Sequence, residues 1–213
     1  MFHSTSKSYQ PLFAKLLPKL NETLRKGELG RIGVVGGSKL YTGAPFFAAM
    51  TSLRVGGDMV HVFCPSEAAP IIKSYSPELM VHPSYDRNTI NDSIHRIDSL
   101  ILGPGLGRDQ AVMRVVEDTI QISRERQLPI IIDADALYML ATKLSLIKDY
   151  PKAILTPNYP EFTRLYEHAF GSDEKLDDNK RFSGDAAKQL ATYLGCTIFQ
   201  KGPTDIITDG HQS

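Results

Sequence analysis

Residues 153–165, AILTPNYPEFTRL, join a short apolar run to a polar segment that can begin a helix. The apolar run 153–155 predicts a buried strand. Asn158 is a favourable N-cap residue and Glu161 follows three positions later, as in a capping box. The two prolines fix the path of the chain outside the helix interior, where proline is tolerated. Open α/β sheets bind ligands where a strand ends in such a loop, although an ordinary strand-to-helix connection explains the pattern equally well.

The rest of the chain repeats this alternation of apolar runs and helical patterns. Strands are predicted at 31–35, 58–64, 78–82, 99–102, 129–133, 153–155, 197–200 and 205–208. Helices are predicted at 43–57, 65–74, 88–96, 109–127, from 135 onward, at 158–170 and at 183–194, with an exposed charged loop at 171–181. Repeated strand–helix units predict an α/β protein with three α/β/α layers and a doubly wound, mostly parallel sheet.

The pattern predicts one principal domain over residues 30–213, without a linker or an internal repeat. Residues 1–29 predict an N-terminal helical segment packed on that domain. The last strand is followed by Asp209-Gly210, a strong hairpin signal. A hairpin needs a returning strand, and three residues remain, so we expect the chain to stop within a motif. A frayed terminus that happens to contain Asp-Gly is the alternative.

The composition, with 42% hydrophobic and 23% charged residues, is that of an ordinary soluble globular protein. Lys and Arg total 24, as do Asp and Glu, which gives no reason to expect nucleic acid or an anionic membrane as partner. No apolar run approaches the ~20 residues that span a bilayer. The sequence has only two cysteines, Cys64 and Cys196, which we expect to be buried thiols in a reducing compartment, the cytoplasm. If the N-terminus is the remnant of an organelle-targeting peptide, the mitochondrion is the alternative. The sequence leaves formation of a homo-oligomer open.

Four further polar or glycine-rich loops follow predicted strands: Gly36-Gly37-Ser38, Gly103 to Asp109, Asp133 to Asp135, and Lys201 to Asp205. Each has a functional and a structural interpretation. Glycine loops can hold phosphate on backbone N–H groups or form tight turns. Paired carboxylates can position Mg²⁺ or a base, or can cap a helix and bind a loop. A lysine can meet a nucleotide phosphate or lie in solvent. Their common place at strand ends favours one ligand crevice.

Six motifs, taken in order, resemble a known family. They are GRIGVVGGS (30–38) with YTGAPFFAA (41–49), LGPGLGRD (102–109), IIDADAL (131–137), TPNYPEF (156–162) and KGPTDII (201–207). This order is similar to that of the ATP-dependent (S)-NAD(P)H-hydrate dehydratases, metabolite-repair enzymes with the ribokinase-like fold. The resemblance runs from about Gly30 to Gly210.

The resemblance implies a carbon–oxygen lyase reaction. ATP with Mg²⁺ would phosphorylate the ring hydroxyl of the S epimer of hydrated NADH or NADPH. Loss of phosphate would then restore NAD(P)H, with release of ADP and phosphate. A hydroxyl leaves poorly and a phosphate leaves well, so the protein would need phosphate clamps, a metal and exclusion of water.

The resemblance also implies site residues. Those expected to contact the hydrated dinucleotide are Gly105, Gly107, Asn158, Tyr159, Pro160, Glu161, Phe162, Thr163 and Arg164. Those expected to contact ATP are Lys201, Gly202, Pro203, Thr204 and Asp205. Gly36, Gly37 and Ser38 would shape the crevice, and Asp133 would order solvent or Mg²⁺. The metal ligands themselves stay unassigned.

One departure from the family bears on activity. The family continues into a second glycine-rich loop ending in Gly-Asp, whose aspartate is the catalytic base, and this sequence ends before it, at Ser213. We therefore expect a fold truncated at its C-terminus, a catalytic base that lies beyond Ser213 and not within the chain, and little activity. The alternatives are a ribokinase-like kinase for a vitamin precursor or sugar, and a non-catalytic nucleotide-binding fragment. The preference for NADH or NADPH hydrate is open.

Overall fold

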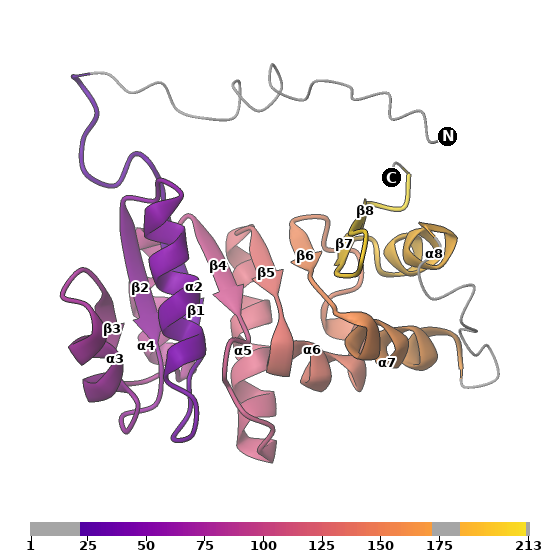
Figure 1. Ribbon diagram of the computed structural model, residues 1–213, viewed down its shortest axis with the longest axis horizontal. Coiled ribbons are helices and arrows are strands. Elements are labelled where there is room, and N and C mark those ends of the chain that lie inside the picture. The colour runs from indigo at the N-terminus through magenta and orange to yellow at the C-terminus, as the bar shows by residue number, and fades with distance from the viewer. Residues whose placement is uncertain (1–21, 172–183, 212–213) are drawn as a thin grey trace.

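The computed structural model describes residues 22–171 and 184–211, which form one eight-stranded sheet with helices on both faces (Figure 1). The strands are β1 (Arg31–Val35), β2 (Met59–Phe63), β3 (Met80–His82), β4 (Ser99–Leu102), β5 (Ile130–Ile132), β6 (Ala153–Leu155), β7 (Thr197–Gln200) and β8 (Ile206–Thr208). The helices are α2 (Gly43–Arg54), α3 (Ala69–Tyr75), α4 (Arg87–Ser93), α5 (Gln110–Arg126), α6 (Ala134–Ala141), α7 (Tyr159–Phe170) and α8 (Gly184–Leu194), with 3-10 turns at Ile94–Arg96 and Leu144–Leu146.

The strand order is β3-β2-β1-β4-β5-β6-β7-β8. Every neighbouring pair is parallel except β7 and β8, which are antiparallel. The predicted three-layer, mostly parallel α/β sheet is therefore confirmed. From β1 the chain adds β2 and β3 on one side, and it then adds β4 onward on the other. The gap between β1 and β4 is thus the point at which the order reverses, where doubly wound sheets bind ligands.

Two cores lie on opposite faces of the sheet. Side chains alternate between faces along a strand, so Val34 and Val35 enter different cores. The smaller core packs β1, β2 and β3 against α2 and α3. The larger core packs the sheet against α4, α5, α6, α7 and α8. Figure 1 shows α2 in front of β1 and α5 behind the sheet.

The face that carries α2 is unevenly covered by the described helices. The middle residues of β5 and β6, Ile131 and Ile154, are 37% and 36% exposed, while the residues on either side of each are buried. Ile207 of β8 is 56% exposed. The part of the chain that the structure describes therefore leaves an apolar stripe over this half of the sheet. None of the described helices combines the length and the apolar character needed to cross a membrane.

Most predicted elements are confirmed, with shifts at helix starts. The predicted helix at 65–74 begins later, at Ala69, because residues 65–68 form a turn closed by the Ala68 N–H on the Pro65 carbonyl. The helix expected from Asp135 begins at Ala134 instead, with Asp133 in the N-cap position. Both cysteines are free and buried, as predicted.

Two predicted segments fall largely outside the described residues. The helical segment expected over residues 1–29 is one of them, and its described part, residues 22–29, contains turns and no helix. The loop predicted at 171–181 falls outside apart from residue 171, and so does residue 183, where the last helix is predicted to begin. Both expectations therefore stay predictions.

The C-terminal end of the described chain is a turn. Gly210 has a φ of +91° and donates its N–H to Thr208 Oγ1 at 3.1 Å, so a turn follows β8. The hairpin that the described residues contain is β7–β8 itself. The last residue, Ser213, lies outside the described residues. The expectation that the catalytic base lies beyond Ser213 is therefore not tested by the structure and stays a prediction.

Candidate nucleotide site at the carboxyl edge of the sheet

The five loops singled out in the sequence meet along one edge of the sheet. They follow β1, β4, β5, β6 and β7, which pair in parallel, so their carboxyl ends point the same way. The Lys201 N–H donates to the Pro157 carbonyl at 2.8 Å, which fastens the loop after β7 to the loop after β6. The Asp133 N–H likewise donates to the Leu102 carbonyl at 3.0 Å. The predicted common edge is therefore confirmed.

The loop after β1 packs directly on the glycine loop after β4. The Gly37 N–H donates to the Pro104 carbonyl oxygen at 2.8 Å. A Cβ atom at Gly36 would lie 2.4 Å from the same oxygen, so only glycine permits this approach. The Gly36 N–H donates to the Phe63 carbonyl at 3.0 Å. Gly36 and Gly37 are buried, and their N–H groups are used within the fold. They shape the crevice by close packing.

The glycine loop after β4 is held by the loop after β5. Gly107 has a φ of +80°, and its N–H donates to Asp135 Oδ2 at 2.9 Å. The other carboxylate oxygen of Asp135 accepts from Arg108 Nε at 3.2 Å. Asp135 therefore occupies the backbone donor that a phosphate could otherwise take. The interpretation of Asp135 as a helix cap is wrong, since its carboxylate bonds a segment 28 residues away.

A cavity of about 530 Å³ opens at the switch point between β1 and β4. Its lining combines the loop after β1 with the glycine loop and the start of α6. The lining residues are Ser38, Lys39, Leu40, Tyr41, Gly105, Gly107, Arg108, Asp109 and Asp135. Both glycines expected to contact the dinucleotide therefore face this cavity.

The start of α7 carries the predicted capping box. The Glu161 N–H donates to Asn158 Oδ1 at 3.0 Å, and the Asn158 N–H donates to Glu161 Oε2 at 2.8 Å. Burial raises the pKa of Glu161, against the opposing effects of the Asn158 N–H and of Lys201. The side chain of Asn158 is exposed, as is Pro160.

The other predicted substrate residues of α7 differ in exposure. Phe162 is fully buried in the larger core, so its side chain packs the helix onto the sheet. Thr163 Oγ1 is buried and has no hydrogen-bond partner among the residues that the structure describes. Tyr159 and Arg164 are half-buried. The Arg164 guanidinium carbon lies 4.7 Å from the centre of the Tyr138 ring.

The loop after β7 pairs its lysine with Asp133. Lys201 Nζ lies 2.8 Å from Asp133 Oδ1, and the two side chains are 41% and 33% exposed. The Gly202 N–H donates to Asp205 Oδ1 at 3.1 Å, which closes the loop on itself. Gly202, Pro203, Thr204 and Asp205 are exposed. The ammonium predicted for a nucleotide phosphate and the carboxylate predicted for solvent or Mg²⁺ are thus one ion pair.

Within residues 22–171 and 184–211, no three His, Cys, Asp or Glu side chains come together closely enough to hold a metal ion. An all-protein metal cage is therefore not built from these residues. Mg²⁺ bound through nucleotide phosphates needs one or two carboxylates, a requirement that Asp133 meets.

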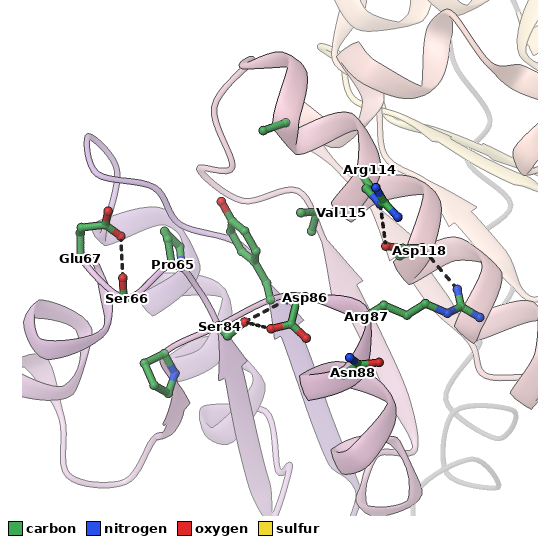
Figure 2. A pocket seen from close by; sticks show the side chains of 13 residues that line it. Pro65, Ser66, Glu67, Ser84, Asp86, Arg87, Asn88, Arg114, Val115 and Asp118 are labelled. Carbon is green, nitrogen blue, oxygen red and sulfur yellow. Dashed lines mark hydrogen bonds and ion pairs between the residues drawn. The ribbon is translucent and has the colours of Figure 1, made fainter.

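A second cavity, of about 620 Å³, lies where β2 and β3 end, against α4 and α5 (Figure 2). Several of its charged side chains already have partners in the protein: Arg87 pairs with Asp118 at 3.4 Å, and Glu67 accepts a hydrogen bond from Ser66 Oγ at 3.0 Å. Asp86 accepts the Thr89 N–H at 2.9 Å and so caps α4. None of the residues predicted from the motifs lines this cavity. The candidate site is therefore the cavity at the switch point and the loops after β5, β6 and β7.

Two residues of this edge escaped the sequence reasoning. Arg108 stands inside the LGPGLGRD motif, and its guanidinium carbon lies 4.4 Å from the centre of the Tyr138 ring. Tyr138 follows Asp135 by three positions, so both occur on one side of α6. The three-residue spacing from Asp135 could have placed Tyr138 at this edge. Its contacts with Arg108 and Arg164 could not be predicted, because both arginines are distant in sequence.

Comparison with known proteins identifies relatives over nearly the whole chain. The family model described as NAD(P)H-hydrate dehydratase matches residues 32–213. The human ATP-dependent (S)-NAD(P)H-hydrate dehydratase is 46% identical over 206 residues, covering 94% of this chain and 58% of the human protein. The zebrafish (Danio rerio) protein of the same name is 47% identical over 205 residues, covering 94% of this chain and 61% of that protein. The chain thus spans about 60% of the length of these relatives.

Solved structures agree on the fold. A ribokinase-like superfamily protein from Enterococcus faecalis superposes with a TM-score of 0.78 at 20% identity, covering 93% of this chain and 66% of that one. The ADP/ATP-dependent NAD(P)H-hydrate dehydratase from Bacillus subtilis, co-crystallised with ATP and Mg²⁺, gives 0.70 at 22% identity, covering 92% and 66%. The fold is therefore ribokinase-like. With the family model matched from β1 to the end of the sequence, this chain belongs to the NAD(P)H-hydrate dehydratase family.

Proposed function

We propose that this protein takes part in the ATP-dependent dehydration of the S epimer of hydrated NADH or NADPH, restoring NAD(P)H with release of ADP and phosphate. Its relatives carry the name ATP-dependent (S)-NAD(P)H-hydrate dehydratase. The observation that carries the proposal is the bond between the Lys201 N–H and the Pro157 carbonyl at 2.8 Å. It holds the segment expected to bind ATP beside the segment expected to bind the dinucleotide, as transfer of a phosphoryl group between them requires.

The protein's part in this reaction is to position phosphates and to stabilise their charge. Lys201 supplies a compact positive charge at the end of β7, where the phosphates of ATP would lie. When Lys201 binds those phosphates, the carboxylate of Asp133 would be released from its ion pair and could bind the Mg²⁺ that accompanies ATP. The metal, when bound, neutralises charge that develops on the transferred group. The carboxylate of Asp133 is partly exposed and therefore accessible for this exchange.

The dinucleotide would lie between the glycine loop and the start of α7. Gly105 and Gly107 line the cavity of about 530 Å³, and Asn158 presents an exposed amide from the N-cap. Thr163 Oγ1 is a buried hydroxyl without a partner among the described residues, and a polar ligand group would satisfy it. Phe162 would support the site through packing alone.

Calorimetry with two variants tests the ATP part of the proposal. Lys201→Ala should weaken binding of ATP with Mg²⁺ by at least about tenfold, the loss expected for one charge-assisted contact. Lys188→Ala, which removes an exposed lysine from α8, is the matched control and should bind ATP normally. Equal binding by both variants would remove Lys201 from the site.

The reaction itself is tested with hydrated NADH, ATP and Mg²⁺. The protein used is the natural gene product that contains this chain, at its full length. Recovery of NADH absorbance together with free phosphate is the expected result. A stable phosphorylated product without NADH recovery would instead identify a small-molecule kinase. Heat of nucleotide binding without any turnover would identify a non-catalytic binding protein.

We further propose that the protein works in the cytoplasm on small-molecule nucleotides. Two free, buried cysteines suit a reducing compartment. Fluorescence of a tagged protein in cells would test the location and would separate cytoplasm from mitochondrion. Light scattering would test the homo-oligomer that the sequence leaves open.

A further inference from the structure

We propose that Arg108, Tyr138 and Arg164 form the subsite for the diphosphate group of the dinucleotide. The inference rests on the proposed function and adds two residues, Arg108 and Tyr138, that the motifs did not assign. It concerns the part of the substrate that links the nicotinamide nucleotide to the adenosine, and not the reacting ring.

The three side chains come together from three separate elements. Arg108 belongs to the glycine loop after β4, Tyr138 to α6 and Arg164 to α7. The guanidinium carbons lie 4.4 Å and 4.7 Å from the centre of the Tyr138 ring, within the range of cation–π contacts. Because both distances share one centre, the two cations are at most about 9 Å apart. The tyrosine ring thus contacts two positive charges from two different elements.

The cluster lies between the two segments expected to hold the dinucleotide. Arg108 follows Gly107 directly, and Arg164 ends the segment that begins at Asn158. Tyr138 links the two through its ring. Arg108 also lines the cavity of about 530 Å³, and its side chain is 60% exposed, so a ligand can reach it. A dinucleotide that touches both segments would therefore lie near this cluster.

The N–H donors of the cluster suit a phosphate group. Asp135 accepts from Arg108 Nε at 3.2 Å and orients the guanidinium, which carries four further N–H donors. A second carboxylate, that of Glu161, interacts electrostatically with Arg164, so two carboxylates balance the two guanidiniums and a phosphate would be recognised by the guanidinium N–H donors. Lys39 and Asp109, which also line the cavity, oppose each other in sign. Planar guanidinium groups bind phosphate oxygens in pairs, and a diphosphate presents two such groups in sequence.

The cavity at the ends of β2 and β3 is less suited to this ligand. Its lining carries Glu67, Asp86 and Asp118 against Arg87 and Arg114, so its net charge is negative. Arg87 is already shared between Asp118 and Glu125. The diphosphate is therefore placed on the Tyr138 side of the glycine loop.

The test measures binding of three reduced ligands by calorimetry: NADH, NADPH and reduced nicotinamide mononucleotide, which lacks the diphosphate linkage. The variants are Arg108→Gln and Arg164→Gln. Arg114→Gln, which removes an 88% exposed arginine from the other cavity, is the matched control.

Each glutamine variant should lose about tenfold in affinity for NADH and for NADPH alike, as expected for one charged contact. Affinity for the mononucleotide should stay within about twofold. A loss confined to NADPH would overturn the assignment in favour of its additional phosphate. An equal loss for all three ligands would overturn it in favour of a role in holding the loop. If the unaltered protein binds NADH but no variant differs from it, the subsite alone fails. If it binds no nicotinamide nucleotide, the proposed function fails.

Discussion

Replacing Asn158 by alanine separates the stability that its cap provides from the binding role proposed for it. The Asn158 side chain accepts one hydrogen bond, from the Glu161 N–H at 3.0 Å. Alanine removes this bond and leaves the reciprocal bond, from the Asn158 N–H to Glu161 Oε2, in place. Because the position is exposed, water can reach the freed N–H, so the cost should be about 1 kcal/mol of unfolding free energy. In a domain of this size that corresponds to about 2–4 °C in Tm.

Asn158→Asp is the control for the cap. Aspartate keeps the oxygen that accepts the Glu161 N–H, and its negative charge is favourable at a helix N-terminus. The aspartate variant should therefore unfold within about 0.5 kcal/mol of the unaltered protein. It lacks the amide N–H₂ group, so it should lose affinity for NADPH as the alanine variant does, if the amide contacts the dinucleotide.

Urea denaturation measures the first quantity and calorimetry with NADPH measures the second. Equal destabilisation by alanine and aspartate would refute the capping argument, because only one of them removes the acceptor. Unchanged NADPH affinity in both variants would assign Asn158 to the helix start and withdraw it from the site.

Three further predictions concern the stability of the fold. Gly103→Ala should lower the free energy of unfolding in urea by at least about 3 kcal/mol, because φ is +125° and the new Cβ would lie 1.8 Å from a backbone carbonyl oxygen. Gly56→Ala is the control, since Gly56 has a φ of +112° but a Cβ there would have nothing within 4 Å, and it should lower the unfolding free energy clearly less. Equal losses in the two variants would contradict the packing argument. Burial, with His82 beside it, lowers the pKa of His61 to about 4. The unfolded chain takes up that proton near pH 6.5, so stability should fall by on the order of 2–3 kcal/mol as the pH drops from about 6.5 to 4; an unchanged pH dependence in His61→Gln would exclude this source. Burial raises the pKa of Cys196 to about 12, so a thiol reagent should modify it only after urea is added, and modification of the native protein at pH 8 would contradict its burial.

The parts of the fold that depend on local sequence could be predicted. The capping box of Asn158 and Glu161 joins residues three positions apart, so the pattern alone indicates both of its bonds. The short apolar strands could also be predicted locally, because a parallel strand buried on both faces consists of an uninterrupted run of apolar residues. The common edge of the site loops followed from parallel pairing.

The contacts that decide the chemistry depend on distant residues and could not be predicted. Asp135 resembles an N-terminal helix residue in sequence, yet its carboxylate bonds Gly107 and Arg108 of another loop. Lys201 and Asp133 are 68 residues apart and form an ion pair only because β5 and β7 end at the same edge. The residues next to Tyr138 in sequence give no sign of a binding role. Its proposed role depends on contacts with two arginines from other elements.

The unequal division of the interior between two cores has a consequence for native-state fluctuations. The smaller core depends on α2, α3 and the three-residue edge strand β3, whereas the larger core unites five helices. Local unfolding draws on the units with the fewest apolar contacts, so the β2–β3–α3 unit should open at a lower free energy than the rest. The cavity at the switch point has Ser38 to Tyr41 on the side of the smaller core, and Gly105 to Asp109 on the side of the larger. The wall from Ser38 to Tyr41 leads into α2, which packs on the smaller core, so we expect this wall of the candidate site to fluctuate more than the wall that the glycine loop forms.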